Sequence, residues 1–236
     1  MKPTAAPRLH RTAVALLLAG ILPAAAFAQQ PEAPEVLQAL QDTLDSVADV
    51  SFLATGELRA ADGTRYPLEI EVEALPQEQL LRLFILQPDA LADNFIIVTP
   101  DDLYNYNYLT NQIVVYDSGD PQAYGPLAGD SNANFELTLD LAELFAGWDA
   151  LVTGESETED GPAWQLELTN VDPAANIAAA TILVLQESSF PQQITVITGA
   201  GEPMLHIEAS RVEFDTGLSA EDLMWYPPDA ELIDER

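Results

Sequence analysis

Two stretches of the chain repeat apolar residues at every third or fourth position. The first, residues 35–48, follows Pro34, and proline is well tolerated in the first turn of a helix. The second, residues 137–148, has Gly147 near its end, where glycine commonly terminates a helix. Each stretch therefore predicts an amphipathic helix with one apolar face. The apolar positions are Leu37, Leu40, Leu44 and Val47 in the first stretch, and Leu137, Leu141, Leu144, Phe145 and Trp148 in the second.

Elsewhere apolar and polar residues alternate, which is the pattern of a strand with one buried face. The alternation is clearest in residues 67–74, where Leu68, Ile70 and Val72 are separated by glutamates. An Asp-Gly pair at 62–63, shortly before this stretch, indicates a hairpin turn. Further strands are predicted at 80–86, 94–99, 103–108, 112–116, 163–169, 181–186, 192–198 and 203–214.

Closely spaced strands with short turns predict an antiparallel meander rather than alternating strand and helix units. Residues 117–134 predict a mobile loop, and the acidic residues 154–161 predict a solvated turn. A sheet with this many strands curls. The predicted fold class is therefore mostly β (α+β), a curled antiparallel sheet whose concave apolar face is covered by two amphipathic helices.

The N-terminus has the organisation of a secretory signal. Three basic residues precede a short apolar run at 13–22, and Ala-Phe-Ala at 26–28 fits the cleavage rule. The apolar run is too short to span a bilayer. We expect residues 1–28 to be a cleaved signal peptide and residues 29–236 to form a single soluble domain in an exported compartment, without a lipid anchor because no cysteine stands at the cleavage site.

The charge of the chain becomes more extreme once residues 1–28 are set aside. Five basic and 39 acidic residues then remain, a net charge of −34, with no lysine and no cysteine. Nucleic-acid binding needs a basic footprint and is excluded, and a polybasic membrane anchor is disfavoured. Hydrophobic residues make up 48% of the chain, which is enough for a core. The acids fit a solvated surface, suited to a salty environment or to repulsion from anionic membranes.

Motifs for catalysis and metal binding are missing from the sequence. His206, the one histidine after residue 28, lies in an alternating run that predicts a strand, so a Ser-His-Asp triad is disfavoured. Histidine and cysteine metal spacing, phosphate-binding glycine loops and a calcium loop are all absent. A pair of catalytic carboxylates stays open, since 39 acids produce pairs by chance. We expect no enzyme activity, no metal and no cofactor.

Four segments resemble one protein family, in the family's order. They are Ser-Phe at 51–52 after the first helix, FIIVTPDDLYNYNYLTNQIVV at 95–115, SFPQQITV at 189–196 and AEDLMWYPPDAELID at 220–234. The last is similar to the family's closing Pro-Pro segment. Together they resemble the LolA-like periplasmic carriers and sorting proteins of outer-membrane lipoproteins, over the whole chain after the signal peptide.

The resemblance implies an unclosed antiparallel β-barrel with helices as a lid over an apolar cavity. It implies a periplasmic monomer that takes lipoprotein acyl chains from an inner-membrane lipoprotein-releasing transporter to an outer-membrane receptor. Two positions depart from the family. Leu75 stands where several carriers have an arginine that holds the lid, and Ala230-Glu231 replaces a Gly-Val pair. Arg82 is a possible substitute for that arginine, and the release mechanism stays open.

The helix stripes and strand phases give a candidate apolar cavity and lid. A filled core needs the same residue types, so both interpretations stay open. Two other functions do as well, a lipid or lipopeptide sensor of the envelope and a scaffold module without a ligand. The candidate ligand-binding residues are Leu37, Leu40, Leu44, Val47, Phe52, Leu68, Ile70, Val72, Leu83, Ile96, Tyr104, Tyr106, Leu141, Leu144, Phe145 and Trp148.

Overall fold

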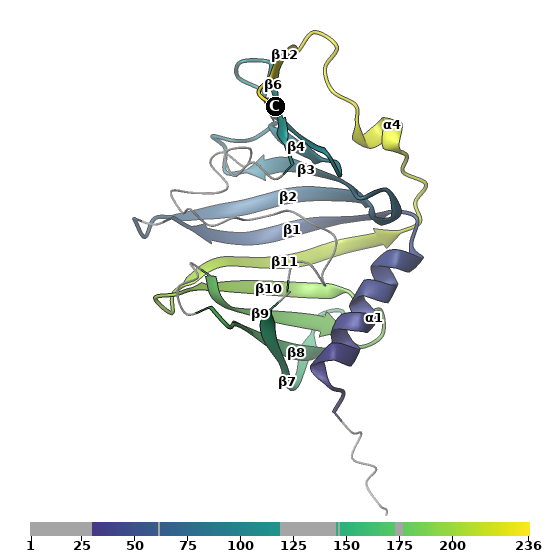
Figure 1. Cartoon of the computed structure of the whole chain (residues 1–236), viewed down its shortest axis with the longest axis vertical. Coiled ribbons are helices and arrows are strands. Elements are labelled where there is room, and N and C mark those ends of the chain that lie inside the picture. The colour runs from purple at the N-terminus through teal and green to yellow at the C-terminus, as the bar shows by residue number, and fades with distance from the viewer. Residues whose placement is uncertain (1–29, 61, 119–144, 146, 173–176) are drawn as a thin grey trace, which may run out of the picture.

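The computed structural model describes residues 30–60, 62–118, 145, 147–172 and 177–236. Within these ranges the chain forms one twelve-stranded sheet in the order β12-β6-β5-β4-β3-β2-β1-β11-β10-β9-β8-β7 (Figure 1). The strands are β1 (Val50–Arg59), β2 (Arg65–Leu75), β3 (Leu80–Gln87), β4 (Phe95–Val98), β5 (Asp102–Asn107), β6 (Gln112–Asp117), β7 (Trp148–Thr158), β8 (Gly161–Asn170), β9 (Ile177–Leu185), β10 (Pro191–Thr198), β11 (Pro203–Phe214) and β12 (Glu231–Asp234).

The two edge strands, β7 and β12, do not pair with each other, so the sheet is not closed. Neighbouring strands are antiparallel, except that β12 runs parallel to β6. The hairpin predicted at 62–63 is confirmed, because the Gly63 N–H donates to the Ala60 carbonyl at 2.9 Å and Gly63 adopts a φ of 85°. The predicted fold class, mostly β with an unclosed sheet and few helices, is confirmed.

Helix α1 (Ala33–Ser46) confirms the first predicted helix. The helix begins after Glu32, which forms a capping box with Glu35, and Pro34 lies in the first turn. Its buried stripe packs on β7, β8 and β9, on what we call the helix face of the sheet. In Figure 1, α1 crosses the sheet near one end of these strands. The buried α1 residues are Ala33, Val36, Leu40 and Leu44.

The helix face carries two apolar clusters that join across β10 and β11. Ile207, which packs on the first cluster, is paired in register with Ile194, which packs on the second. The first cluster is Val50, Ala54, Ile70, Val72, Ala74, Leu81, Leu83, Ile96, Val98, Leu103, Phe190 and Ala209, and the second is Val152, Leu166, Leu168, Ala180, Ile182 and Val184 together with the α1 stripe.

The opposite face of β3–β6 is covered by the C-terminal residues 215–236, which we call the strap. The strap contains the short helix α4 (Ala220–Leu223) and ends in β12. Leu223 is fully buried and packs with Phe95 and Ile97 of β4. Figure 1 shows the strap leaving β11, passing through α4 and returning to β6. The chain therefore covers the two faces of its sheet with two different segments.

The second predicted helix, at 137–148, is only partly within the described residues. Residues 137–144 lie outside them, Phe145 and Gly147 are in a turn, and Trp148 begins β7. The prediction is therefore wrong at its C-terminal end. The predicted loop at 117–134 falls outside the described residues beyond Ser118.

The predicted turn at 154–161 is wrong for residues 154–158, because β7 continues through Thr158, and the turn itself occupies only residues 159–160. β7 is an edge strand with many exposed positions, so the glutamates at 155 and 157 are solvated within a strand. Polar composition alone cannot tell such an edge strand from a loop.

Candidate functional site

The helix face brings together most of the predicted ligand-binding residues. Leu40 and Leu44 of α1 are buried against β7–β9, and Leu37 packs at the margin of the same cluster. Phe52 packs on the cluster that holds the predicted β2, β3 and β4 residues. Val47, just after α1, is buried as well. The predicted sheet residues that lie on this face are Leu68, Ile70, Val72, Leu83 and Ile96.

Tyr104 and Tyr106 do not join this surface. Ile96 of β4 is paired with Asn105, so the two tyrosines on either side point to the opposite face, beneath the strap. The Tyr106 ring stacks on Phe95 with 4.6 Å between centroids. Burial raises the pKa of both tyrosines. In the run Leu-Tyr-Asn-Tyr both phases of the alternation look plausible, which is why the face predicted for the two tyrosines is wrong.

Of the four predicted ligand-binding residues at 141–148, the structure describes two. Leu141 and Leu144 lie outside the described residues. Phe145 and Trp148 pack on the helix-face cluster, with 6.0 Å between ring centroids in an edge-to-face arrangement. They therefore contact the expected apolar surface, although they do so from a turn and a strand rather than from a helix.

Half-buried apolar side chains extend the helix face from β6 to β7. Edge-to-face contacts join Phe190 to Phe52 at 5.4 Å and to Phe214 at 5.7 Å between centroids. An apolar surface of this kind binds hydrocarbon through area removed from water and needs no reactive group. The half-buried residues are Phe52, Tyr116, Ile207, Val212 and Phe214 on the first cluster, and Leu37, Phe145, Trp148, Ala150, Trp164 and Ile194 on the second.

Asp49 joins the end of α1 to the start of the strap. It lies between Val47 and the first residue of β1, and its side chain is only 1% exposed. Its Oδ1 accepts from the Thr216 N–H at 2.8 Å and the Thr216 hydroxyl at 2.7 Å. Its Oδ2 accepts from the Gly217 N–H at 2.8 Å and the Leu218 N–H at 3.2 Å. We call this arrangement the Asp49 junction.

The electrostatics of the Asp49 junction favour the charged carboxylate. Burial by itself raises the pKa of Asp49, but the Thr216 hydroxyl and the three backbone N–H donors outweigh it and lower the pKa below its ordinary value. The contact is reciprocal, because the Ala48 N–H donates to Asp215 Oδ1 at 2.7 Å. The C-terminal end of α1 is thus fastened to the strap by hydrogen bonds.

Helix α1 has fewer polar ties along its length. The Thr43 hydroxyl of α1 donates to the Ser188 carbonyl at 3.1 Å, and the side-chain amide of Gln30, which precedes the helix, donates to the Val152 carbonyl on β7 at 2.6 Å. The other α1 contacts with the sheet described above are apolar. An apolar ligand competes for contacts of this kind without breaking a hydrogen bond.

Arg82 holds the strap rather than α1. Its Nη1 donates to the Asp222 carbonyl of α4 at 3.2 Å, and its guanidinium lies 4.8 Å from the centroid of the Phe95 ring. Burial lowers the pKa of Arg82, and the carboxylate of Glu73 opposes this shift. The expectation that Arg82 substitutes for a lid-holding arginine is therefore wrong, since it lies on the face opposite α1. Leu75 is buried on that same face.

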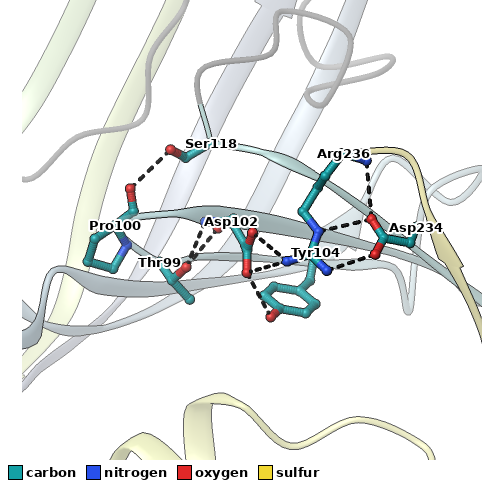
Figure 2. A network of polar contacts seen from close by, with 7 residues as sticks. All are labelled: Thr99, Pro100, Asp102, Tyr104, Ser118, Asp234 and Arg236. Carbon is teal, nitrogen blue, oxygen red and sulfur yellow. Dashed lines mark hydrogen bonds and ion pairs between the residues drawn. The ribbon is translucent and has the colours of Figure 1, made fainter.

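The C-terminal residue fastens the end of the strap to β5. Figure 2 shows the Arg236 guanidinium between two carboxylates, with Nη1 3.0 Å from Asp102 Oδ1 and Nη2 2.8 Å from Asp234 Oδ2. The Arg236 contacts lower the pKa of Asp234 to about 2. Tyr104 donates its hydroxyl to Asp102 at 3.3 Å. These contacts join the end of the strap to β5 and have a structural role.

The reactive residue types form no evident reaction centre in the part of the chain that the structure describes. His206 Nδ1 lies 2.9 Å from the Thr195 hydroxyl, and its Nε2 lies 3.4 Å from the Glu208 carboxylate, with the ring partly exposed. Within the described ranges, no three histidine, aspartate or glutamate side chains are placed to hold a metal ion. No helix in these ranges is both long and apolar enough to cross a membrane.

The chain matches no protein-family model, and no curated protein resembles it in sequence. Solved structures do resemble it. An uncharacterised conserved protein from Thermus thermophilus superposes with a TM-score of 0.62 and 22% identity, covering 86% of this chain and 98% of that chain. MucB in the MucA/MucB complex of Pseudomonas aeruginosa superposes with a TM-score of 0.51 and 14% identity, covering 83% of this chain and 67% of that chain.

A further solved structure shows a more distant likeness. A putative outer-membrane lipoprotein-sorting protein domain from Vibrio parahaemolyticus superposes with a TM-score of 0.48 and 12% identity, covering 80% of this chain and 95% of that chain. At such identities the likenesses concern the fold. Function therefore has to be argued from the site.

Proposed function

We propose that the protein is a periplasmic carrier that shields lipoprotein acyl chains on the helix face. The observation that supports this best is the band of half-buried apolar residues that runs across the helix face beside α1. Burying hydrocarbon contributes about 0.8 kcal/mol per CH₂, so acyl chains in water have a strong drive to occupy such a surface. No covalent step is needed, and the proposal includes neither a cofactor nor catalysis.

Release follows from the same contacts. Helix α1 packs on apolar residues that an acyl chain would also contact, so binding has to displace protein contacts and its net affinity falls. The Asp49 junction keeps the C-terminal end of α1 in place while the apolar part of the helix yields. This arrangement suits a carrier, which has to give up its cargo.

The proposal extends to the route of the cargo. Residues 1–28 act as the signal peptide, and residues 29–236 form one domain that travels as a monomer. An inner-membrane lipoprotein-releasing transporter supplies the acylated lipoprotein, and an outer-membrane receptor accepts it. The acidic surface keeps the carrier away from anionic membranes during transit.

Co-purification tests the proposal. The full chain is expressed with its signal peptide, isolated from the periplasm and analysed by native mass spectrometry. We expect one acylated lipoprotein per chain, and we expect Ile207→Glu on the helix face to lose it. Leu151→Glu is the matched control, because Leu151 is 63% exposed on edge strand β7. Protein without bound lipid, or equal loading of both variants, would contradict the proposal.

A second function is favoured by the likeness to MucB. That protein was solved in complex with MucA, and its superposition on this chain has a TM-score above 0.5. A lipid or lipopeptide sensor would use the same helix face and transmit binding to a protein partner. Co-purification separates the two functions, because a sensor of lipid would carry phospholipid or a lipid fragment in place of intact lipoprotein.

A further inference from the structure

Exposed aromatic and aliphatic side chains occur in the strap and in the β5–β6 turn that the strap contacts. Among the described residues, eight large apolar side chains are exposed, and five of them belong to the strap or to the turn between β5 and β6. We call these five the strap patch. They are Tyr108, Leu109, Trp225, Tyr226 and Leu232.

Hydrogen bonds join the β5–β6 turn to residues 229–231 of the strap. The Asn111 amide donates to the Asp229 carbonyl at 3.1 Å, and the Glu231 N–H donates to the Asn111 carbonyl at 2.9 Å. Leu232 is then paired in register with Ile113 of β6. The β5–β6 turn and residues 229–232 of the strap therefore lie side by side.

The strap patch rests on a rigid support. Leu223 is fully buried beneath the strap, and Met224, next to Trp225, packs on the same cluster. Pro227 and Pro228 follow Tyr226 and restrict the backbone. A surface held in this way loses little conformational freedom when a partner binds, which favours affinity.

Burial within the chain does not account for these side chains. Trp225 is 58% exposed and Leu109 is 83% exposed, so neither contributes most of its surface to a core. Tryptophan and tyrosine are the residue types that dominate protein–protein contacts. The composition of the strap patch is therefore that of a contact surface.

The charge around the strap patch identifies the chemistry of the partner. Glu221, Asp229 and Glu231 are exposed beside it. The arginine beneath the strap and the arginine at its end are engaged, Arg82 with the Asp222 carbonyl and Arg236 with carboxylates. The rim is therefore negative. A second copy of the chain or an anionic bilayer would be repelled, whereas a cationic surface would be attracted.

We propose that the strap patch docks a protein partner whose contact surface has an apolar recess flanked by lysine or arginine side chains. This site lies on the opposite side of the sheet from the helix face, so cargo and partner bind at the same time. The partner contacts the segment that the Asp49 junction joins to the end of α1.

The test uses a defined probe, a short amphipathic helical peptide of leucine and lysine, and the full chain without its signal peptide. We expect the peptide to bind, with a blue shift of Trp225 fluorescence. The double variant Leu109→Ala/Trp225→Ala should bind it about tenfold or more weakly. Leu151→Ala/Val171→Ala is the matched control, because both residues are exposed apolar residues elsewhere on the sheet, and it should bind as the original chain does.

Several outcomes would overturn the inference. Equal affinity of the two double variants would show that charge alone attracts the peptide. Equal binding of a leucine–glutamate peptide would remove the charge argument. Binding of phosphatidylglycerol vesicles, or self-association abolished by Leu109→Ala/Trp225→Ala, would assign the strap patch to a membrane or to a second copy. Both double variants should keep the melting temperature of the original chain, which excludes a folding defect. Both should also bind a triacylated lipopeptide as the original chain does, which separates this test from the helix-face proposal.

Discussion

Replacing Asp49 by asparagine changes the buried junction between α1 and the strap with almost no change of shape. The carboxylate accepts two hydrogen bonds at each oxygen, from Thr216 at Oδ1 and from Gly217 and Leu218 at Oδ2. Asparagine keeps one oxygen and presents an NH₂ group in place of the other. In either orientation at least one buried N–H of the strap loses its acceptor.

The cost can be worked from these contacts. An unsatisfied buried donor costs about 1–3 kcal/mol, and hydrogen bonds to a charged group are worth about 1.5–3 kcal/mol, against about 1 kcal/mol for neutral ones. The Thr216 hydroxyl can rotate to accept a hydrogen bond from the new NH₂ group. We therefore expect a total cost near the lower end of the range that these separate costs add up to. Asp49→Asn should lower the free energy of unfolding by about 2–4 kcal/mol, or roughly 5–15 °C in melting temperature for a domain of this size.

Urea unfolding followed by circular dichroism measures the loss. Asp45→Asn is the matched control, because Asp45 is exposed on α1 and its replacement removes the same charge. The control should stay within about 0.5 kcal/mol of the original chain. An Asp49→Asn variant as stable as Asp45→Asn would refute the reasoning.

Acid unfolding provides a second readout of the same junction. Because the pKa of Asp49 is lowered in the folded protein, its stabilising effect is present above the unfolded pKa of about 3.9 and is lost as the pH falls through the folded pKa. The original chain should therefore lose stability below about pH 4. Asp49→Asn should lack the part of this stability loss that comes from Asp49. If the free energy of unfolding falls identically with pH in both proteins below pH 4, the acid sensitivity belongs to other carboxylates.

Three further substitutions test other parts of the structure. Gly56→Ala would place its Cβ 1.9 Å from the His206 carbonyl oxygen, so urea unfolding should show a loss of about 1–3 kcal/mol, whereas Gly154→Ala, with open space at its Cβ, should change little. Leu223→Ala beneath the strap should cost about 2–5 kcal/mol, and Leu232→Ala, which is 56% exposed, should cost much less. Arg236→Gln should raise the Asp234 pKa from about 2 toward about 3.9 in a carboxyl NMR titration, and Arg65→Gln should leave it unchanged.

The alternation of apolar residues was sufficient to predict the strands that have one buried face. Residues 67–74 fall within β2, and Leu68, Ile70 and Val72 lie on the face that the alternation predicts. The spacing of apolar residues also predicted the buried stripe of α1. Leu40 and Leu44, two residues of that stripe, are buried in the structure. In both cases the local pattern and the tertiary burial agree.

Other features depend on contacts that the local pattern does not record. Edge strand β7 is solvated along much of its length and therefore looks like a loop. The strap has no local pattern that predicts β12, because the parallel pairing of β12 with β6 joins residues far apart in the chain. Asp49 is one of 39 acids, and its partners lie 167 to 169 residues later, so only the folded chain distinguishes it.

Fluorescence quenching by a triacylated lipopeptide with brominated acyl chains tests the central claim most directly. Trp148 and Trp164 pack on the helix face, and Trp225 is exposed on the strap, so the three tryptophans report on opposite faces. We predict that the lipopeptide quenches Trp225→Phe, which keeps the two helix-face tryptophans, and leaves Trp148→Phe/Trp164→Phe unquenched. Quenching of Trp225 alone, equal quenching of both proteins, or no quenching at saturating lipopeptide would contradict the assignment of acyl chains to the helix face.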